Sequence, residues 1–405
     1  MQGIDRRAMA SLSGGHAATD FSQGAVSSLL VFFRDDLSLS YTQTSAIILV
    51  ATFASSLIQP LFGVWSDKRT AIWIMPLGVL ASGIGIALAC VAPSYPLLLL
   101  CVLLSGIGVA AYHPEASKYA RYVSGTRRAG GMSLFSIGGN LGFALGPVAG
   151  SSFVLWLGLE GGLLLAVPAV LVGVLLVALL PYLHSFTPER GKPGVRHEGE
   201  DQPRALALLL AVVSFRSVGH MGLFTFIPLW EVAKGNGEAH GSRLLSLFLL
   251  SGAVGTLLGG ALADRVGHRA MTRWSHLVSV PLILVYVLVG GIVGDVFVVL
   301  AGGVIIATFS VTLVMSQEYL PRRVGLASGL SIGLSIGLGG VAAVVLGGVA
   351  DLVGIKTAVI ATVSGPVIAA LLTFWLPEGR AGRTLEPESG VATVADVVEG
   401  GARAR

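Results

Sequence analysis

The sequence predicts an all-α membrane protein in which twelve transmembrane helices form two pseudo-symmetric six-helix bundles. Three observations lead to this fold class: a composition too poor in charge for water, apolar segments of membrane-spanning length, and an internal repeat. Of the 405 residues, 54% are hydrophobic and 12% are charged, whereas a soluble protein carries about 25% charged residues. Lipid must therefore surround most of the chain.

The apolar segments recur along the whole chain, and each has the length of about 20 residues that a bilayer-spanning helix requires. We expect spans at roughly 11–33, 42–65, 71–92, 96–119, 129–157, 161–183, 205–230, 243–263, 272–293, 296–319, 324–350 and 356–376. The polar interval 184–204 has no apolar periodicity and predicts a solvated linker. The predicted domains are an N-terminal bundle (1–183), this cytoplasmic linker (184–204), a C-terminal bundle (205–377) and a disordered cytoplasmic tail (378–405).

The two predicted bundles repeat each other in sequence. The loop "GVWSDKR" in the first bundle corresponds to "GALADRVGHR" in the second, and "RRAGGMSLFSIGG" corresponds to "RRVGLASGLSIGL". Chance similarity between apolar helices would explain matching Leu and Gly residues, but it explains coinciding charged loop residues poorly. A six-helix repeat about an axis along the membrane normal is typical of two-bundle secondary transporters.

Lys and Arg residues gather in alternate loops, which predicts the orientation. Basic residues mark the loops near 68–69, 121–128, 265–273 and 322–323, as well as both termini and the linker. The positive-inside rule then places the termini and the linker in the cytoplasm of a multi-pass protein of the bacterial inner membrane. The net charge of +4 is scattered over short loops, so we expect a lipid bilayer and no nucleic acid as partner.

Several longer motifs resemble one family. The loop "GGALADRVGHR" resembles the signature loop of the major facilitator superfamily. More narrowly, "SSLIQPLFGVWSDK", "AYHPEASKYAR", "SLFSIGGNLGFALGP" and "SQEYLPRRVGLASGL" together resemble the fosmidomycin resistance branch of that superfamily, over nearly all twelve helices. The resemblance implies alternating-access efflux driven by inward proton flow, with the first, fourth, seventh and tenth helices lining the cavity.

The resemblance also implies that two equivalent cytoplasmic loops, one in each half, brace the closed inner gate. The residues carried over to this gating role are Asp67, Lys68, Arg69, Asp264, Arg265 and Arg269. Glu318 lies at the cytoplasmic end of the tenth span near Arg322, so a gating ion pair is a more natural role for it than substrate binding. These residues act on conformation and do not bind the substrate.

Ionisable residues inside the first and fourth spans predict a proton site. His16 and Asp20 are four residues apart and share one face of the first helix, and His113 and Glu115 flank Pro114 in the fourth. Facing lipid, each charge would cost at least ~2.5 kcal/mol, so we expect a water-filled cavity. Asp20, His113 and Glu115 are the candidate proton-coupling residues. The alternatives are a structural aspartate, and a polar helix end that reaches water beside a Glu115–Lys118 pair.

Arg216 near the middle of the seventh span predicts an anion site. A guanidinium keeps its charge and needs an acid or an anionic ligand, and it binds phosphonates and carboxylates through two parallel hydrogen bonds. The repeat places Asp20 at the equivalent position of the first half. We therefore expect the two to pair when the cavity is empty, and an anion to compete while a proton neutralises Asp20; a permanent salt bridge is the alternative. Further candidate substrate-binding residues are His220, His16, Tyr112 and Gln317.

Together these features predict a proton-coupled secondary active transporter, a drug/proton antiporter that exports a small anionic or amphipathic, fosmidomycin-like compound. Import of an anionic metabolite on the same fold, and a membrane receptor that does not transport, remain alternatives. No nucleotide-binding loop, metal cluster or nucleophile motif is found in the sequence, so we expect no enzyme activity, metal or cofactor. The expected partners are a small-molecule substrate and protons, and the expected oligomeric state is a monomer.

Overall fold

The computed structural model describes residues 3–68, 71–125, 128–187 and 200–377, and these residues form helices and connections with no strand among them. Most of the predicted linker, the predicted tail and the predicted gating residue Arg69 lie outside the described residues. The side chains of Asp67 and Lys68 also lie outside what is described.

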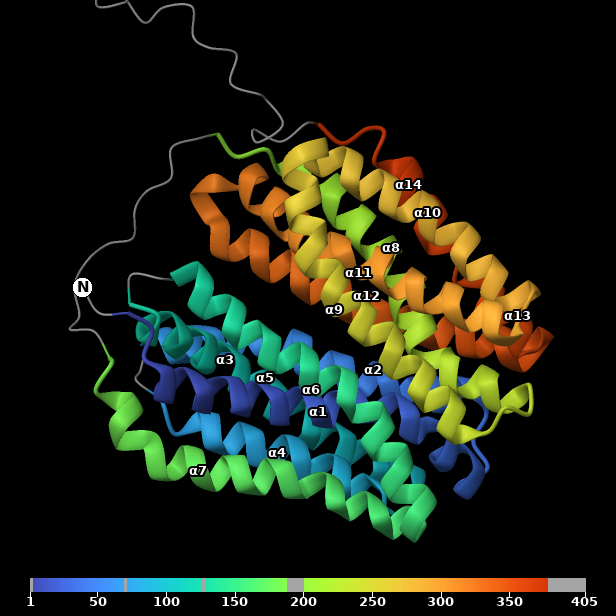
Figure 1. Ribbon diagram of the computed structural model, residues 1–405, viewed down its shortest axis with the longest axis horizontal. Coiled ribbons are helices and arrows are strands. Elements are labelled where there is room, and N and C mark those ends of the chain that lie inside the picture. Colours follow the sequence, from blue (N-terminus) through green and yellow to red (C-terminus); the bar gives the residue numbers. More distant parts are fainter. Residues whose placement is uncertain (1–2, 69–70, 126–127, 188–199, 378–405) are drawn as a thin grey trace, which may run out of the picture.

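Each span that the sequence predicts is occupied by one or more helices. The first half contains α1 (Arg6–Asp36), α2 (Tyr41–Leu57), α3 (Gln59–Lys68), α4 (Ile74–Ala89), α5 (Tyr95–Val123), α6 (Arg128–Leu157), the 3-10 helix η1 (Leu159–Leu165) and α7 (Ala166–His184). The second half contains α8 (Pro203–Ala233), α9 (Glu238–Val266), α10 (His268–Leu288), α11 (Gly291–Tyr319), the 3-10 helix η2 (Pro321–Arg323), α12 (Val324–Val353), α13 (Ile355–Ala361) and α14 (Ser364–Leu372). Figure 1 shows the two sets of helices as two groups packed side by side.

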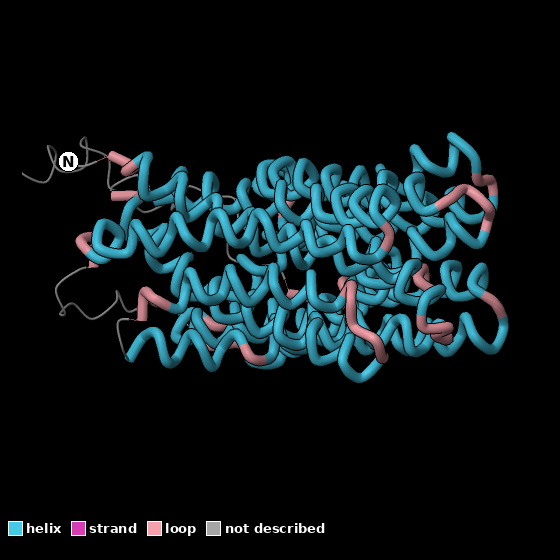
Figure 2. The backbone as a smooth tube through the Cα atoms, turned by 90° about the horizontal axis from the view of Figure 1, so that it is seen from below, coloured by secondary structure: helices cyan, strands magenta, loops and turns pink. Residues whose placement is uncertain are grey.

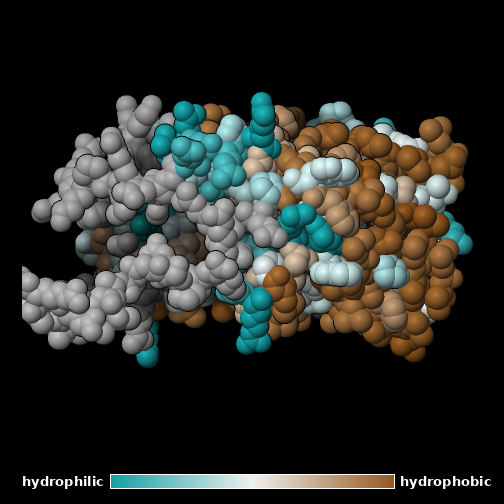
Figure 3. All heavy atoms as spheres, turned by 90° about the horizontal axis from the view of Figure 1, so that it is seen from above, coloured by the Kyte–Doolittle hydropathy of each residue, from teal (hydrophilic) through white to brown (hydrophobic). Residues whose placement is uncertain are grey.

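Ten spans in the described part of the chain are long and apolar enough to cross a membrane. The remaining two predicted spans fall on α1 and α4. Helix α1 is long enough, with 31 residues, but contains many polar side chains, and α4 is apolar but has only 16 residues. Apolar side chains cover much of the visible face of the molecule (Figure 3), as expected where lipid replaces water. The chain is therefore a multi-pass membrane protein with a twelve-helix, two-bundle fold.

Proline explains where the helices depart from the predicted spans. The second span is interrupted at Ile58, between α2 and α3, because Pro60 has no N–H to give to the carbonyl of Ser56. The last span is interrupted between α13 and α14, where Pro366 stands in the same relation to Thr362. In contrast, α5 continues without interruption through Pro114.

Buried apolar residues form three large cores and one small cluster of Ala71, Ile74 and Ala111. We call the end where residues 184–204 join the halves the linker end, and the opposite end the far end. One large core is shared by both halves at the far end and includes Leu29, Phe33, Ile47, Phe226 and Phe248. At the linker end each half has its own core: Leu12, Tyr112 and Leu183 are members in the first half, and Leu209, Met315 and Tyr319 in the second. The two halves are thus packed together at the far end and separately at the linker end (Figure 1). Figure 2 shows that the helices run lengthwise between these two ends.

Polar contacts between the halves follow the same division. Asp351 at the end of α12 accepts hydrogen bonds from the backbone N–H groups of Tyr41 (2.8 Å) and Thr42 (2.9 Å) and from the Thr42 hydroxyl (2.6 Å). Its negative charge therefore lies at the N-terminus of α2, where a helix dipole favours an anion. The Ser27 hydroxyl donates to the carbonyl of Phe224, whose ring stacks on Phe143 at 5.4 Å. Contacts of this kind close the far end.

Candidate functional site

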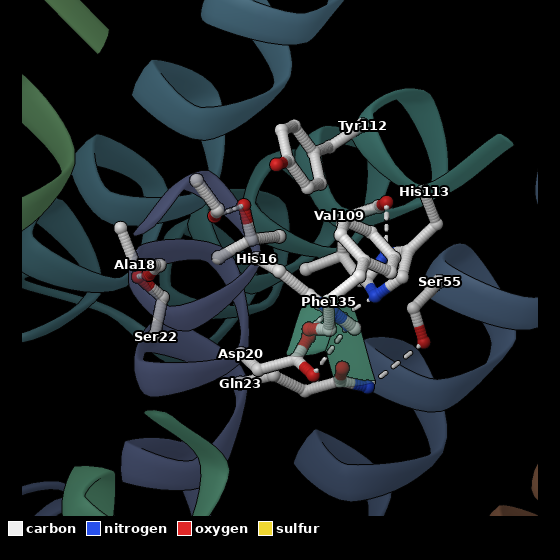
Figure 4. A network of polar contacts seen from close by, with 12 residues as sticks. His16, Ala18, Asp20, Ser22, Gln23, Ser55, Val109, Tyr112, His113 and Phe135 are labelled. Atoms are coloured by element: carbon white, nitrogen blue, oxygen red, sulfur yellow. Dashed lines mark hydrogen bonds and ion pairs between the residues drawn. The ribbon is translucent and has the colours of Figure 1, made fainter. Parts of the chain in front are cut away.

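The first half contains a cluster of one carboxylate and two imidazoles, shown in Figure 4. Asp20 on α1 lies between His16, one turn earlier on the same helix, and His113 on α5. His16 Nε2 is 3.2 Å from Asp20 Oδ2, and His113 Nε2 is 3.2 Å from Asp20 Oδ1. The three side chains are 12%, 16% and 21% exposed for His16, Asp20 and His113. We call this group the His–Asp–His cluster.

Backbone carbonyls orient both imidazoles of the cluster. His16 Nδ1 lies 2.9 Å from the carbonyl of Phe135 on α6, and His113 Nδ1 lies 2.8 Å from the carbonyl of Val109. A carbonyl oxygen can only accept a hydrogen bond, so both Nδ1 atoms carry hydrogen. The ring of His16 also stacks on Phe135 at 4.2 Å. As a result, both Nε2 atoms point at the Asp20 carboxylate.

Glycine on α6 makes room for the cluster. Helix α1 packs more extensively on α6 than on any other helix. A side chain at Gly139 would collide with His16 Nε2, and its Cβ would lie 2.7 Å from Asp20 Oδ2. At Gly142, a Cβ would collide with the carbonyl of Ala17. Small residues at these positions allow α1 to come close enough to α6 for the Phe135 carbonyl to reach His16.

Tyr112, a predicted substrate-binding residue, supports the cluster from behind. Its side chain is fully buried, and its hydroxyl donates to the carbonyl of Leu12. Its ring lies beside those of His16 and His113. On the other side, Gln23 donates to the Ser55 hydroxyl at 3.1 Å. In this conformation Tyr112 packs against the cluster, and a substrate-binding role for it stays a prediction.

The second half contains a buried arginine surrounded by hydroxyl groups. Arg216 on α8 is 4% exposed. It donates to Thr312 at 3.1 Å and Thr308 at 3.5 Å on α11, and to Ser335 at 2.9 Å on α12. The Thr308 and Thr312 hydroxyls donate their own hydrogens to backbone carbonyls of α11. The guanidinium is therefore solvated but not neutralised, since no carboxylate of the described residues is in ion-pair distance of it.

Two histidines accompany Arg216. His220, one turn further on α8, stacks on Phe248 at 6.1 Å, and its Nε2 has no hydrogen-bond partner among the described residues. His276 on α10 is fully buried, and its Nδ1 lies 2.6 Å from the carbonyl of Thr272. His220 was a predicted substrate-binding residue. His276 was not, because nothing in the pattern of its own helix indicates that it lies near Arg216.

The structure does not form the expected ion pair between Asp20 and Arg216. Asp20 is engaged by imidazoles of its own half, and Arg216 by hydroxyls of its own half. The repeat correctly placed the two residues on α1 and α8, but equivalent positions in two bundles need not be close in space. Direct competition of a proton and an anion for one salt bridge is thus not the arrangement of this conformation.

Glu115 also lies apart from the His–Asp–His cluster. Its carboxylate is 2.7 Å from Lys118 Nζ, and the side chain is 1% exposed. The i,i+3 pair that the spacing allows is therefore present. Because His113 and Glu115 point in different directions from α5, only His113 of the two joins Asp20.

Predicted gating residues lie at the linker end. His268 Nδ1 is 3.9 Å from Glu318 and its Nε2 is 3.8 Å from Asp264. Arg269 donates to the carbonyls of Thr373 (3.1 Å) and Phe374 (2.7 Å) just after α14. Arg265 is exposed at the end of α9, and Gln317, a predicted substrate-binding residue, is partly buried beside Glu318 on α11. This end thus carries histidine–carboxylate contacts and helix-end contacts on the second half.

A third polar network at the far end was missed from the sequence. Glu231 on α8 is fully buried, 2.6 Å from Lys234 Nζ and hydrogen-bonded to the Tyr286 hydroxyl at 2.8 Å. His240 Nε2 lies 3.2 Å from Asp295 and 3.6 Å from Glu231. The i,i+3 spacing of Glu231 and Lys234 was the available signal. Donor atoms lie within 4.8 Å of one another both here and in the His–Asp–His cluster, so each group could hold a cation, either protons or a metal ion.

Comparisons with known proteins agree with this fold. The family model described as Major Facilitator Superfamily matches residues 12–331. The uncharacterized MFS-type transporter YfnC of Bacillus subtilis (strain 168) is 32% identical, covering 90% of this chain and 91% of the relative. The fosmidomycin resistance protein of Escherichia coli (strain K12) is 30% identical, covering 92% and 93%.

Solved transporter structures share the fold. An inward-facing, unoccupied bacterial homologue of the human lysosomal transporter Spinster superposes with a TM-score of 0.75 at 17% identity, covering 91% of this chain and 96% of that chain. The inward-open xylose transporter XylE of E. coli superposes with a TM-score of 0.73 at 15% identity, covering 93% and 97%. Family model, relatives and fold are consistent, and members of this family are transporters rather than enzymes. The chain therefore belongs to the major facilitator superfamily, within which it is similar to the fosmidomycin resistance protein.

Proposed function

We propose that the protein exports a small anionic compound in exchange for protons by alternating access. The observation that carries the proposal is Arg216: a guanidinium that is 4% exposed and has no carboxylate among the described residues in ion-pair distance. A buried charge without a counter-charge is costly, and an anionic ligand would supply that counter-charge. A guanidinium binds carboxylates and phosphonates through paired hydrogen bonds. The relative named for fosmidomycin resistance makes fosmidomycin the first compound to test.

Proton coupling is proposed for the His–Asp–His cluster of the first half. Asp20 and His113 come from different helices, and their contact at 3.2 Å depends on protonation. The cluster is partly exposed, so protons can reach it. Because a charge facing lipid would be costly, we propose that the exposed side of the cluster faces water. Glu115, the third candidate, lies in its own pair with Lys118. We therefore propose for Glu115 a part in bracing the linker end.

Coupling between the two sites is proposed to pass through the contact of α1 with α8. Asp20 and Arg216 lie on these two helices, and about two turns beyond each, Ser27 donates to the carbonyl of Phe224. The stacking of Phe143 on Phe224 joins α6 to the same point. A change of charge in the cluster shifts α1 relative to α6, and that shift is felt at α8. The coupling is thus conformational.

Orientation, localisation and oligomeric state complete the proposal. The linker end faces the cytoplasm of a bacterial inner-membrane protein, because its loops carry most of the Lys and Arg residues. The bundles 1–183 and 205–377 rock about the far end within one monomer. The gating residues at the linker end, which include Asp264, Arg269 and Glu318, then act when that end closes. Because the two halves have separate cores at the linker end, we propose that this conformation is the one open to the cytoplasm.

Transport in proteoliposomes tests the proposal. The purified full chain is reconstituted, a pH gradient is imposed, and the flux of fosmidomycin and of a panel of small organic anions is followed in both directions. We expect uphill flux of at least one anion against the direction of proton flow. Flux in the same direction as protons would instead support import of an anionic metabolite. The absence of any pH-driven flux would refute proton-coupled transport of these compounds.

A further inference from the structure

We infer that the coupling protons are carried on Nε2 of His16 and of His113, with Asp20 remaining a carboxylate between them, so that one transport cycle can carry two protons. This inference rests on the proposed proton-coupled function and deepens it. It also gives His16 a different role from the substrate-binding role that the sequence predicts.

The first step concerns the hydrogens of the two rings. The carbonyls of Phe135 and Val109 fix a hydrogen on each Nδ1. In a neutral imidazole of this tautomer, Nε2 carries only a lone pair. Such a lone pair facing a carboxylate oxygen at 3.2 Å is repulsive, because both atoms are acceptors. A proton on Nε2 turns the same contact into a charge-assisted hydrogen bond.

The second step concerns the number of protons. His16 faces Oδ2 of Asp20 and His113 faces Oδ1, so each imidazole has an oxygen of its own. Both Nε2–H groups can therefore donate at the same time. A protonated Asp20 has one O–H and would satisfy only one of the two rings. The arrangement fits two imidazolium groups on one carboxylate.

The surroundings add no further charge to the cluster. Helix α5 contributes Tyr112, whose hydroxyl is bonded to the carbonyl of Leu12. Helix α6 contributes the ring and carbonyl of Phe135, and α2 contributes the hydroxyl of Ser55, which is bonded to Gln23. Among the described residues, no other acid or base is in ion-pair distance of the three side chains. The cluster charge therefore runs from −1 without added protons to +1 with two.

A single metal ion is the other occupant that this donor set could take. It would draw both imidazole nitrogens and one carboxylate oxygen toward a common point at about 2 Å. Here the two nitrogens face different oxygens of Asp20. That pairing favours two hydrogens over one metal ion, and the metal becomes an outcome of the test.

The test combines transport stoichiometry with direct titration. The proton-to-substrate ratio is measured in proteoliposomes from the pH gradient that just balances a substrate gradient, for the wild type and for His16→Gln and His113→Gln. Glutamine keeps an N–H donor for Asp20, so the fold is expected to survive. The matched control is His184→Gln, an exposed histidine at the end of α7. In parallel, the protonation of labelled histidines is followed by NMR in the full chain in detergent.

We expect a ratio of two protons per substrate for the wild type and the control, and a ratio of one for each cluster variant. In the NMR measurement, Nε2 of both His16 and His113 should take up a proton in the wild type. A wild-type ratio of one that His16→Gln leaves unchanged would overturn the inference while the proposed function stands. The absence of any pH-driven flux in the wild type would instead overturn the proposed function. Saturable Co²⁺ or Zn²⁺ binding that both cluster variants lose, without titration of Nε2, would overturn the inference in favour of a metal site.

Discussion

The two halves of the molecule place opposite charges at equivalent positions and surround them differently. In the first half, Asp20 is partly exposed and is bound by two imidazoles, whose charge depends on pH. In the second half, Arg216 is buried among hydroxyls, and its charge does not change with pH. One half can therefore respond to protons while the other keeps a constant attraction for an anion. Under the proposed function, the two bundles would divide proton coupling and anion binding between them.

The strongest way to break this comparison is to remove the fixed charge. Arg216→Ala should weaken the binding of an anionic substrate by at least about 100-fold, because two charge-assisted hydrogen bonds are lost at about 1.5–3 kcal/mol each and about 1.4 kcal/mol corresponds to a factor of ten. Arg216→Lys should weaken the same binding by about tenfold, since lysine keeps the charge but lacks the planar guanidinium that forms two parallel hydrogen bonds. Binding is measured by calorimetry in detergent with fosmidomycin and a carboxylate as probes. Thr312→Val, which removes one hydrogen-bond acceptor of Arg216, serves as the control and should lose less affinity. Unchanged affinity in Arg216→Ala would exclude Arg216 as the substrate anchor.

The second prediction removes the charge that the imidazoles share. Asp20→Asn should abolish uphill, pH-driven transport while leaving substrate affinity within about twofold, because Arg216 lies in a separate network. The neutral amide cannot stabilise imidazolium groups on both sides. The measurement compares pH-driven flux with counterflow exchange at equal pH. If Asp20→Asn still followed the pH gradient, the division of tasks between the halves would be wrong.

A third prediction tests the space that α6 leaves for the cluster. Gly139→Ala should cost about 1–3 kcal/mol and reduce pH-driven flux, because its methyl group would collide with His16 and Asp20. Gly14→Ala is the matched control on α1, since a Cβ there meets nothing within 4 Å. Thermal unfolding in detergent and flux are measured for both. Equal behaviour of the two variants would show that the close approach of α6 is unimportant.

The smallest effect is expected at the contact that joins the halves. Asp351→Asn should weaken the capping of α2 by about 1 kcal/mol, since it replaces an anion at a helix N-terminus with a neutral group. This loss acts only while the far end is closed, and so it shifts the population toward the opposite conformation. Accessibility of a cysteine introduced at Ser45 in α2 would report the shift. No change in labelling rate would show that the Asp351 contact is absent in the membrane.

Sequence patterns predicted more of the fold than of the contacts within the candidate site. Hydropathy alone located the spans, and the His16–Asp20 pair followed from helical spacing, since residues four apart share a face. The contact of His113 with Asp20 depends on the distance between two helices, which no local pattern contains. The interruptions at Pro60 and Pro366 were missed because hydropathy ignores backbone hydrogen bonding.

The environment of Arg216 was the largest gap between sequence and structure. Thr308, Thr312 and Ser335 come from two helices and follow no period that distinguishes them from other small polar residues in the membrane. The expected Asp20–Arg216 pair failed because repeat symmetry relates positions and does not give distances. Sequence reasoning identified the charged residues themselves, because charge is rare in these spans, but it could not identify their partners.

The shared core at the far end has a thermodynamic consequence for the transport cycle. Opening that end to water would separate side chains such as Phe33, Phe226 and Phe248 that are now fully or almost fully shielded, and hydrating apolar surface is unfavourable by about 25 cal/mol per Å². The ligand-free protein should therefore rest facing the cytoplasm, and the reorientation step should show the heat-capacity signature of exposing hydrocarbon to solvent.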